Sequence, residues 1–164
     1  MPHFAAGVVK FQNEVYPEKK ELFEKLSQGQ APEALFITCS DSRIETAMIT
    51  QTEPGELFIC RNAGNIVPPH TNQTGGMTAS IEFAVAALKV PHIVICGHTE
   101  CGAMKGAMNT DSLTTLPHVK EWLGFTKALT MDSALNLPSI DLTCKAIILR
   151  MLIGKFTGRL KNFL

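Results

Sequence analysis

The sequence predicts an α/β domain in which a mainly parallel β-sheet is flanked by helices. Three observations lead to this prediction. Three short apolar runs have the composition of buried strands, and segments with apolar residues at helical spacing lie between them. Alternating strands and helices favour parallel strands joined by right-handed crossovers. Polar residues of the kinds found in active sites directly follow two of the apolar runs.

The length and composition indicate one globular domain covering residues 1–164. Fifteen basic residues balance fifteen acidic ones, so we expect no nucleic-acid partner. The longest apolar run, Ala146–Ile153, contains Arg150 and is too short to cross a bilayer, so we expect no membrane span. No signal sequence opens the chain, which predicts a cytoplasmic protein. Its five cysteines then indicate thiols and metal binding rather than disulfides.

Two helices are predicted before the first strand. Residues 3–15 carry apolar side chains at helical spacing. Pro17 suits the first turn of a second helix, whose inner face consists of Leu22, Phe23 and Leu26. We expect these helices to pack against the sheet or a partner subunit.

The first predicted strand, Ala34–Thr38, leads directly into Cys39. The sequence Ser42-Arg-Ile-Glu45 has the pattern of a capping box, which predicts a helix starting at Ser42. Residues Cys39–Arg43 would therefore lie in a strand-to-helix turn.

The second predicted strand, Glu56–Cys60, runs into the polar loop Arg61–Asn65. A helix follows Thr74-Gly-Gly, and the third strand is His92–Cys96. Further helices are predicted from Gly102 and over Leu116–Trp122.

The tail Lys145–Leu164 contains five basic residues and no acidic one. We expect a helix packed on its own domain here, with a membrane-surface amphipathic helix as the alternative.

Cys39, His98 and Cys101 are the candidate metal ligands. The carboxyl ends of parallel strands meet at one sheet edge, so the residues after the first and third strands should converge. Cysteine and histidine suit Zn²⁺, and three protein ligands with an open fourth position are typical of catalytic zinc. In the alternative interpretation, the cysteines are small buried hydrophobes and His98 is a hydrogen-bonded core residue.

Asp41 and Arg43 are the candidate catalytic pair. A carboxylate beside a guanidinium stays ionised and is held in a fixed direction. Asp41 would either accept a hydrogen bond from water on the metal or itself become the fourth ligand. The simpler alternative is a surface salt bridge. The pattern as a whole predicts a zinc hydro-lyase or hydrolase.

At these residues the sequence resembles the β-class carbonic anhydrases. Cys39-Ser-Asp41-Ser-Arg43 and His98-Thr-Glu-Cys101-Gly102 match the two defining motifs of that family, and the loop Arg61–Asn65 is also similar. The resemblance implies one zinc per chain, bound by Cys39, His98 and Cys101 with water or Asp41 fourth, and hydration of carbon dioxide by the pair Asp41 and Arg43. It also implies a homodimer or larger homo-oligomer, with a substrate pocket lined by Gln30, Phe58, Ala63, Phe83 and Gly102.

The likeness covers residues 3–122, and the tail 123–164 is atypical because it lacks the family's closing strand. We hypothesise a truncated or frame-shifted variant, or an unusual natural form. Two other functions stay open: a non-catalytic zinc- or bicarbonate-binding variant, and a carbon disulfide or carbonyl sulfide hydrolase on the same scaffold. A thiol redox protein is disfavoured because the chain contains no Cys-x-x-Cys. The oligomer size and the resting fourth ligand are also open.

Overall fold

A computed structural model describes residues 2–69, 74–128, 139–143 and 148–155 of the chain. The chain divides into two compact units, Met1–Ala31 and Pro32–Leu164. A single domain over the whole chain therefore stays a prediction. Within the described ranges, no helix has both the length and the apolar character needed to span a membrane.

The N-terminal unit is helical, as its apolar spacing predicts. Its elements are α1 (His3–Lys10), the π-helix η1 (Phe11–Val15), α2 (Tyr16–Glu18) and α3 (Lys20–Leu26). α2 continues directly from η1 with helical backbone at Val15 and Tyr16, so Pro17 lies at this junction and does not open a separate helix. Phe23 of α3 packs its ring against Phe11 and Tyr16, with ring centroids 5.9 and 5.6 Å away. These aromatic contacts hold the two predicted helices together.

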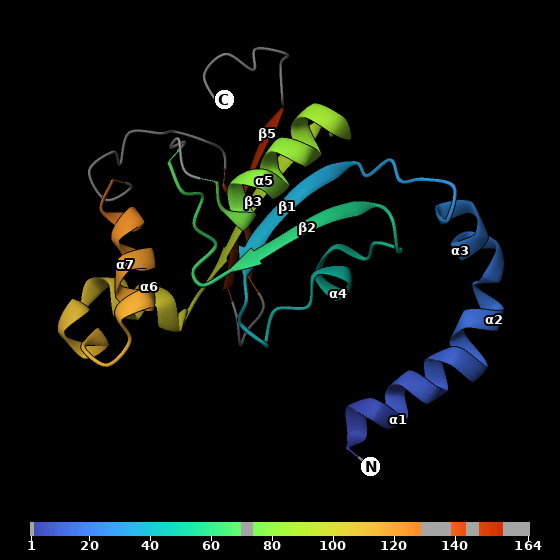
Figure 1. Ribbon diagram of the computed structural model, residues 1–164, viewed down its shortest axis with the longest axis horizontal. Coiled ribbons are helices and arrows are strands. Elements are labelled where there is room, and N and C mark those ends of the chain that lie inside the picture. Colours follow the sequence, from blue (N-terminus) through green and yellow to red (C-terminus); the bar gives the residue numbers. More distant parts are fainter. Residues whose placement is uncertain (1, 70–73, 129–138, 144–147, 156–164) are drawn as a thin grey trace. The chain divides into compact units, whose positions relative to one another are not determined.

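The second unit is built on a five-stranded sheet (Figure 1). Its strands are β1 (Ala34–Cys39), β2 (Leu57–Asn62), β3 (His92–His98), β4 (Ser139–Thr143) and β5 (Ile148–Lys155), in the order β2-β1-β3-β5-β4. β1 pairs in parallel with β2 and β3, whereas β5 is antiparallel to both β3 and β4. The predicted parallel sheet is confirmed for the three strands that carry the site.

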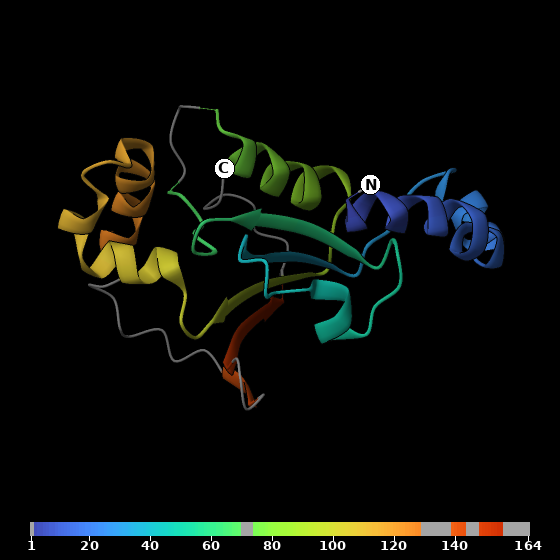
Figure 2. The same cartoon turned by 90° about the horizontal axis from the view of Figure 1, so that it is seen from below.

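β1 is the central strand of the parallel part, and all six of its residues are buried. Phe36 packs with Ile44 on one face of the sheet, where the short helix α4 (Thr46–Thr50) lies. Leu35 packs with Ala84 on the other face, under α5 (Gly76–Glu82) and the π-helix η2 (Phe83–Ala87). Figure 2 shows α4 and α5 on opposite sides of the sheet. Burial on both faces explains why the β1 sequence is almost continuously apolar.

The remaining helices follow the carboxyl end of β3. They are α6 (Gly102–Met108), η3 (Thr110–Leu113), α7 (Pro117–Leu123) and η4 (Gly124–Ala128). Ile66, from the loop after β2, forms a small buried cluster with Leu113 and Leu123. This cluster attaches the loop after β2 to the helices after β3.

The predicted capping box at Ser42 is wrong. The α4 helix starts at Thr46, and its N-cap is Glu45, whose side chain accepts a hydrogen bond from the Ala47 backbone N–H. The Asp41 carboxylate accepts the backbone N–H of Arg43 at 3.0 Å, which forms a turn in place of the first helical turn. The helix therefore begins later than the sequence pattern predicts.

The helix predicted for the tail is also wrong over Ile148–Lys155, which forms β5. The expectation that the tail lacks a further strand fails for the same residues. Their backbone pairs with the whole of β3, from Lys155 opposite His92 to Leu149 opposite His98. The rest of the tail prediction, at residues 145–147 and 156–164, lies outside the described residues.

Cys60 provides a prediction about stability. It is 6% exposed within the cluster under α5, and burial raises the pKa of its thiol. Above about pH 8.5 the unfolded chain loses this proton while the folded chain keeps it. The free energy of unfolding will therefore fall as pH rises, by up to about 1.4 kcal/mol per pH unit for this thiol. Urea titrations at neutral and alkaline pH should show a smaller fall for Cys60→Ala, and an identical fall would contradict this assignment.

Candidate metal centre

The candidate ligands lie where β1 and β3 end. Cys39 is the last residue of β1 and His98 the last residue of β3. Cys101 is the N-cap of α6, three residues further on. Because β1 and β3 are parallel neighbours, their carboxyl ends share one edge of the sheet. The predicted convergence of these residues is therefore confirmed.

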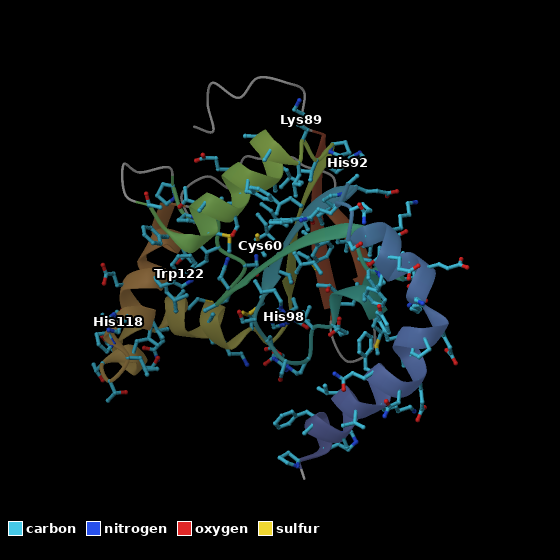
Figure 3. All side chains as sticks on the ribbon, turned by 45° about the vertical axis from the view of Figure 1, so that its right-hand side comes forward. Cys60, Lys89, His92, His98, His118 and Trp122 are labelled. Atoms are coloured by element: carbon cyan, nitrogen blue, oxygen red, sulfur yellow. The ribbon has the colours of Figure 1, made fainter. Side chains whose placement is uncertain are left out.

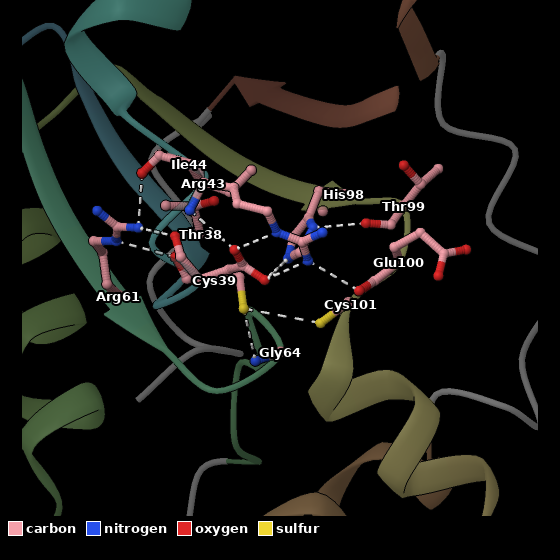
Figure 4. A network of polar contacts seen from close by, with 12 residues as sticks. Thr38, Cys39, Arg43, Ile44, Arg61, Gly64, His98, Thr99, Glu100 and Cys101 are labelled. Carbon is pink, nitrogen blue, oxygen red and sulfur yellow. Dashed lines mark hydrogen bonds and ion pairs between the residues drawn. The ribbon is translucent and has the colours of Figure 1, made fainter. Parts of the chain in front are cut away.

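The three side chains form a compact donor group. The two cysteine Sγ atoms and a ring nitrogen of His98 all lie within 4.8 Å of one another. Cys39 Sγ and Cys101 Sγ are 3.8 Å apart, and both residues are buried free cysteines (Figure 4). A disulfide would require about 2.05 Å. Two thiolates on a tetrahedral zinc, each about 2.3 Å from the metal, would lie about 3.8 Å apart. The sulfur spacing fits zinc.

His98 is oriented as a metal ligand. Its Nδ1 lies 2.8 Å from the backbone oxygen of Thr99. A carbonyl oxygen can only accept, so Nδ1 carries the ring proton and the Nε2 of the neutral ring has a free lone pair. The side chain is only 1% exposed, and Nε2 has no hydrogen-bond partner among the described residues. A buried polar atom without a partner is costly, and a metal ion would satisfy it.

Asp41 is held by Arg43 beside this group. Arg43 donates from Nε to Asp41 Oδ1 at 2.9 Å and from Nη2 to Oδ2 at 2.7 Å. Nη2 also donates to the Glu100 backbone oxygen at 3.1 Å. These bonds from Arg43 hold the pKa of the Asp41 carboxyl well below its usual range. Asp41 is therefore an ionised hydrogen-bond acceptor of fixed direction.

Asp41 lies next to the donor group but outside it. Its Oδ2 is 3.8 Å from His98 Nε2, and the three donors that cluster are Cys39, His98 and Cys101. Both carboxylate oxygens are bonded to Arg43 in this arrangement. Asp41 is thus held beside the three donors by Arg43, close to His98 Nε2.

Arg61 is a site residue that the sequence pattern did not single out. Its guanidinium donates to three backbone oxygens, those of Cys39 at 3.0 Å, Asp41 at 2.8 Å and Ile44 at 2.8 Å. It thereby holds the turn that carries Asp41 and Arg43 (Figure 4). In the sheet register Arg61 lies beside Thr38, one residue before Cys39. Arg61 can be assigned to this turn only when β1 and β2 are known to be neighbouring strands.

Replacing Arg61 with glutamine should loosen that turn. Because bonds from a charged donor are lost, we expect the free energy of unfolding to fall by about 2 kcal/mol and zinc affinity to fall about tenfold. Urea titration and chelator competition measure the two effects. Lys120→Gln, on the exposed side of α7, is the control and should change stability by less than about 0.5 kcal/mol. Wild-type values for Arg61→Gln would show that these bonds do not hold the turn.

Four of the five predicted substrate residues lie in this unit, at two separate places. Ala63 follows β2 and Gly102 begins α6, so both lie at the metal-ligand edge. Phe58 instead contacts Phe83, with ring centroids 6.0 Å apart. Phe58 pairs with Leu35, four residues before Cys39, which places it about 13 Å back along the sheet. Gln30 belongs to the N-terminal unit.

A cavity of about 670 Å³ runs along β2 towards α7. Its lining includes Cys60, Ala63, His118 and Trp122 but none of the three donor residues. Figure 3 shows Cys60 on the sheet and Trp122 and His118 on the helix beyond it. Of the predicted substrate residues, Ala63 alone lines this cavity.

Comparison with known proteins gives a consistent result. The family model described as carbonic anhydrase matches residues 34–146, which extends beyond Trp122. A carbonic anhydrase of Pseudomonas aeruginosa is 51% identical over 129 residues, covering 78% of this chain and 59% of the relative. One from Synechococcus elongatus is 46% identical over 140 residues, covering 83% of this chain and 52% of the relative. The chain thus spans between half and three fifths of the length of these relatives.

Solved structures agree with the sequence relatives. The β-carbonic anhydrase CcaA aligns with a TM-score of 0.74 at 45% identity, over 82% of this chain and 62% of that one. A β-carbonic anhydrase described as tetrameric, from Sordaria macrospora, aligns with a TM-score of 0.68 at 38% identity, over 80% of this chain and 65% of that one. The alignments support the fold described above.

Proposed function

The chain belongs to the β-carbonic anhydrase family, and from this premise we propose that it catalyses the zinc-dependent, reversible hydration of carbon dioxide to bicarbonate and a proton. The observation that carries the proposal is the buried donor group of Cys39, His98 and Cys101, with an ionised carboxylate fixed beside it. This combination provides both a catalytic type of metal site and a charged hydrogen-bond acceptor for water.

Cys39, His98 and Cys101 would hold the zinc, with water in the fourth position. Zinc held there supplies the nucleophile, because the metal lowers the pKa of a bound water towards about 7. The side chains of Asp41 and Arg43 orient the attacking water. Asp41 accepts the hydrogen bond of the attacking water and so directs an oxygen lone pair towards the carbon of carbon dioxide. Arg43 keeps that carboxylate ionised and fixed, so it need not reorganise during the reaction.

Water and carbon dioxide combine as one carbon–oxygen bond forms and a π electron pair moves to the carbonyl oxygen. The product is bicarbonate, and one proton leaves to solvent. Gly102 is an exposed residue that opens α6, and we propose that its backbone N–H donates to an oxygen of the anionic product. We propose Asp41 and Arg43 as the catalytic pair and water as the resting fourth ligand.

We further propose that the chain acts as a homodimer or larger assembly. Ala63 and Gly102 lie at the metal-ligand edge of a chain, whereas Phe58 and Phe83 lie further back on the same unit. A second copy would complete the pocket if its Phe58, Phe83 and Gln30 reached this edge. The description of one relative as tetrameric supports assembly in this family. The cytoplasmic location expected from the sequence stays a prediction.

Stopped-flow measurement of carbon dioxide hydration, with bound zinc quantified in the same sample, tests the proposal. We expect turnover from protein with one zinc per chain, loss of turnover after chelation, and recovery when zinc is restored. Full zinc occupancy without turnover would overturn the catalytic proposal and favour a non-catalytic zinc- or bicarbonate-binding protein.

A further inference from the structure

One peptide group connects Trp122 to the metal ligand Cys39. The indole Nε1–H of Trp122 donates to the backbone oxygen of Ala63 at 2.8 Å. The backbone N–H of Gly64 donates to Cys39 Sγ at 3.4 Å. Ala63 C=O and Gly64 N–H are the two ends of a single trans peptide unit, and they point in opposite directions. The indole and the sulfur are therefore bonded to opposite ends of the same dipole.

The backbone at Gly64 is suited to this arrangement. Gly64 has a φ of +84°, a conformation that favours glycine. A Cβ at this position would lie 2.5 Å from Met104 Cε and 3.3 Å from the Cβ of Ala103 on α6. The absence of a side chain lets the loop lie close to α6 while its N–H points at the sulfur.

The loop is also closed on itself. The Asn62 side chain donates from Nδ2 to the Ile66 backbone oxygen at 2.9 Å and accepts the Ile66 N–H at 2.7 Å. Ile66 is 1% exposed and packs with Leu113 and Leu123. These contacts fix both ends of the loop that presents the Ala63–Gly64 peptide.

Trp122 reaches this peptide from α7, which is distant in sequence. It is half-buried, and its ring meets the ring of Phe125 edge-on, with centroids 5.6 Å apart. Its neighbour Leu123 is 2% exposed in the cluster that contains Ile66. Trp122 and Leu123 are neighbours on α7, and the loop after β2 packs against α7 through Ile66. The indole is therefore held on the helix that contacts this loop.

We propose that Trp122 is a positioning residue for the Cys39 thiolate, an inference that rests on the zinc-binding part of the proposed function. Donation by the indole polarises and orients the Ala63–Gly64 peptide, since linked hydrogen bonds strengthen one another. The Gly64 N–H then withdraws electron density from the sulfur. A thiolate ligand that donates less charge leaves a metal with more Lewis acidity, which is the property hydration requires.

The test replaces only the indole N–H. Trp122 is the only tryptophan in the chain, so growth with 3-benzothienylalanine substitutes a sulfur for the N–H at a single site. The protein is then loaded with Co²⁺ in place of zinc, and the thiolate-to-cobalt charge-transfer band is recorded. Loss of the N–H raises the energy of the sulfur lone pair, so we expect the band to move to longer wavelength. Trp122→Phe should shift the band in the same direction.

Phe125→Leu is the matched control, because it changes packing around the indole and keeps the N–H donor. Its band should remain at the wild-type wavelength. If the band stays at the wild-type wavelength in both the 3-benzothienylalanine protein and Trp122→Phe, the positioning role of Trp122 is wrong. The proposed function would be unaffected by that result. Wild-type protein that takes up Co²⁺ without a charge-transfer band would instead contradict the thiolate site, and with it the proposed function.

Discussion

Replacing Cys39 with serine, or His98 with alanine, will abolish stoichiometric zinc binding. Serine supplies no thiolate near neutral pH, and alanine supplies no donor at all. Each variant leaves two ligands, whereas catalytic zinc sites use three. We expect bound zinc, measured by plasma mass spectrometry after dialysis, to fall from one ion per chain to a trace, and carbon dioxide hydration to disappear with it.

Cys60→Ala is the matched control for this loss. Cys60 is also a buried cysteine of the same sheet, but it is outside the donor group. The Cys60→Ala variant should retain one zinc per chain. That result would separate the effect of losing a ligand from the effect of losing a buried thiol. Full zinc retention by Cys39→Ser would contradict the assignment of the metal centre.

Replacing Asp41 with asparagine will lower kcat/KM for carbon dioxide hydration by about 10²- to 10⁴-fold while zinc stays bound. The substitution keeps the size of the side chain but removes its charge. An amide also cannot accept hydrogen bonds from Arg43 at both of its ends, as the carboxylate does at 2.9 and 2.7 Å. The attacking water thus loses a charged acceptor of fixed direction.

Stopped-flow kinetics and zinc analysis on the same Asp41→Asn sample separate catalysis from metal binding. Asp111→Asn, an exposed acid in η3, provides the control and should retain wild-type kcat/KM. Activity of Asp41→Asn within tenfold of wild type would show that Asp41 is not the hydrogen-bond acceptor that orients the attacking water. Loss of zinc from this variant would indicate that Asp41, and not water, is the fourth zinc ligand.

Arg43→Gln tests the other half of the pair. Without the guanidinium, Asp41 keeps its charge but loses the donors that hold it, so kcat/KM should fall less than in Asp41→Asn. Because the two residues act through one contact, the double variant should be no worse than Asp41→Asn alone.

The strands and the candidate metal ligands were predictable because their signals are local. The β1 run Ala34–Cys39 is apolar on both faces since the strand is buried on both faces. His98 and Cys101 are three residues apart, close enough for one short turn to bring their donor atoms together. The parallel arrangement then follows from the order of strands and helices, and it places Cys39 at the same edge.

Two local patterns failed because other contacts outweighed them, one local and one tertiary. Ser42 and Glu45 have capping-box spacing, but the bonds between Asp41 and Arg43 replace the first helical turn. Ile148–Lys155 forms a strand because the free edge of β3 supplies backbone partners along its whole length.

The sequence by itself determined the three parallel strands, the three candidate donors and the acidic residue beside them, because each depends on composition, strand order or short motifs. The tertiary structure alone decided how these groups are held. Arg61 reaches three carbonyl oxygens of the turn before α4 because β2 lies beside β1. Trp122 reaches the Ala63 carbonyl across 59 residues of sequence because α7 packs against the loop after β2. Hydrogen bonds between distant segments depend on the packing of whole elements, and no spacing along the chain records them.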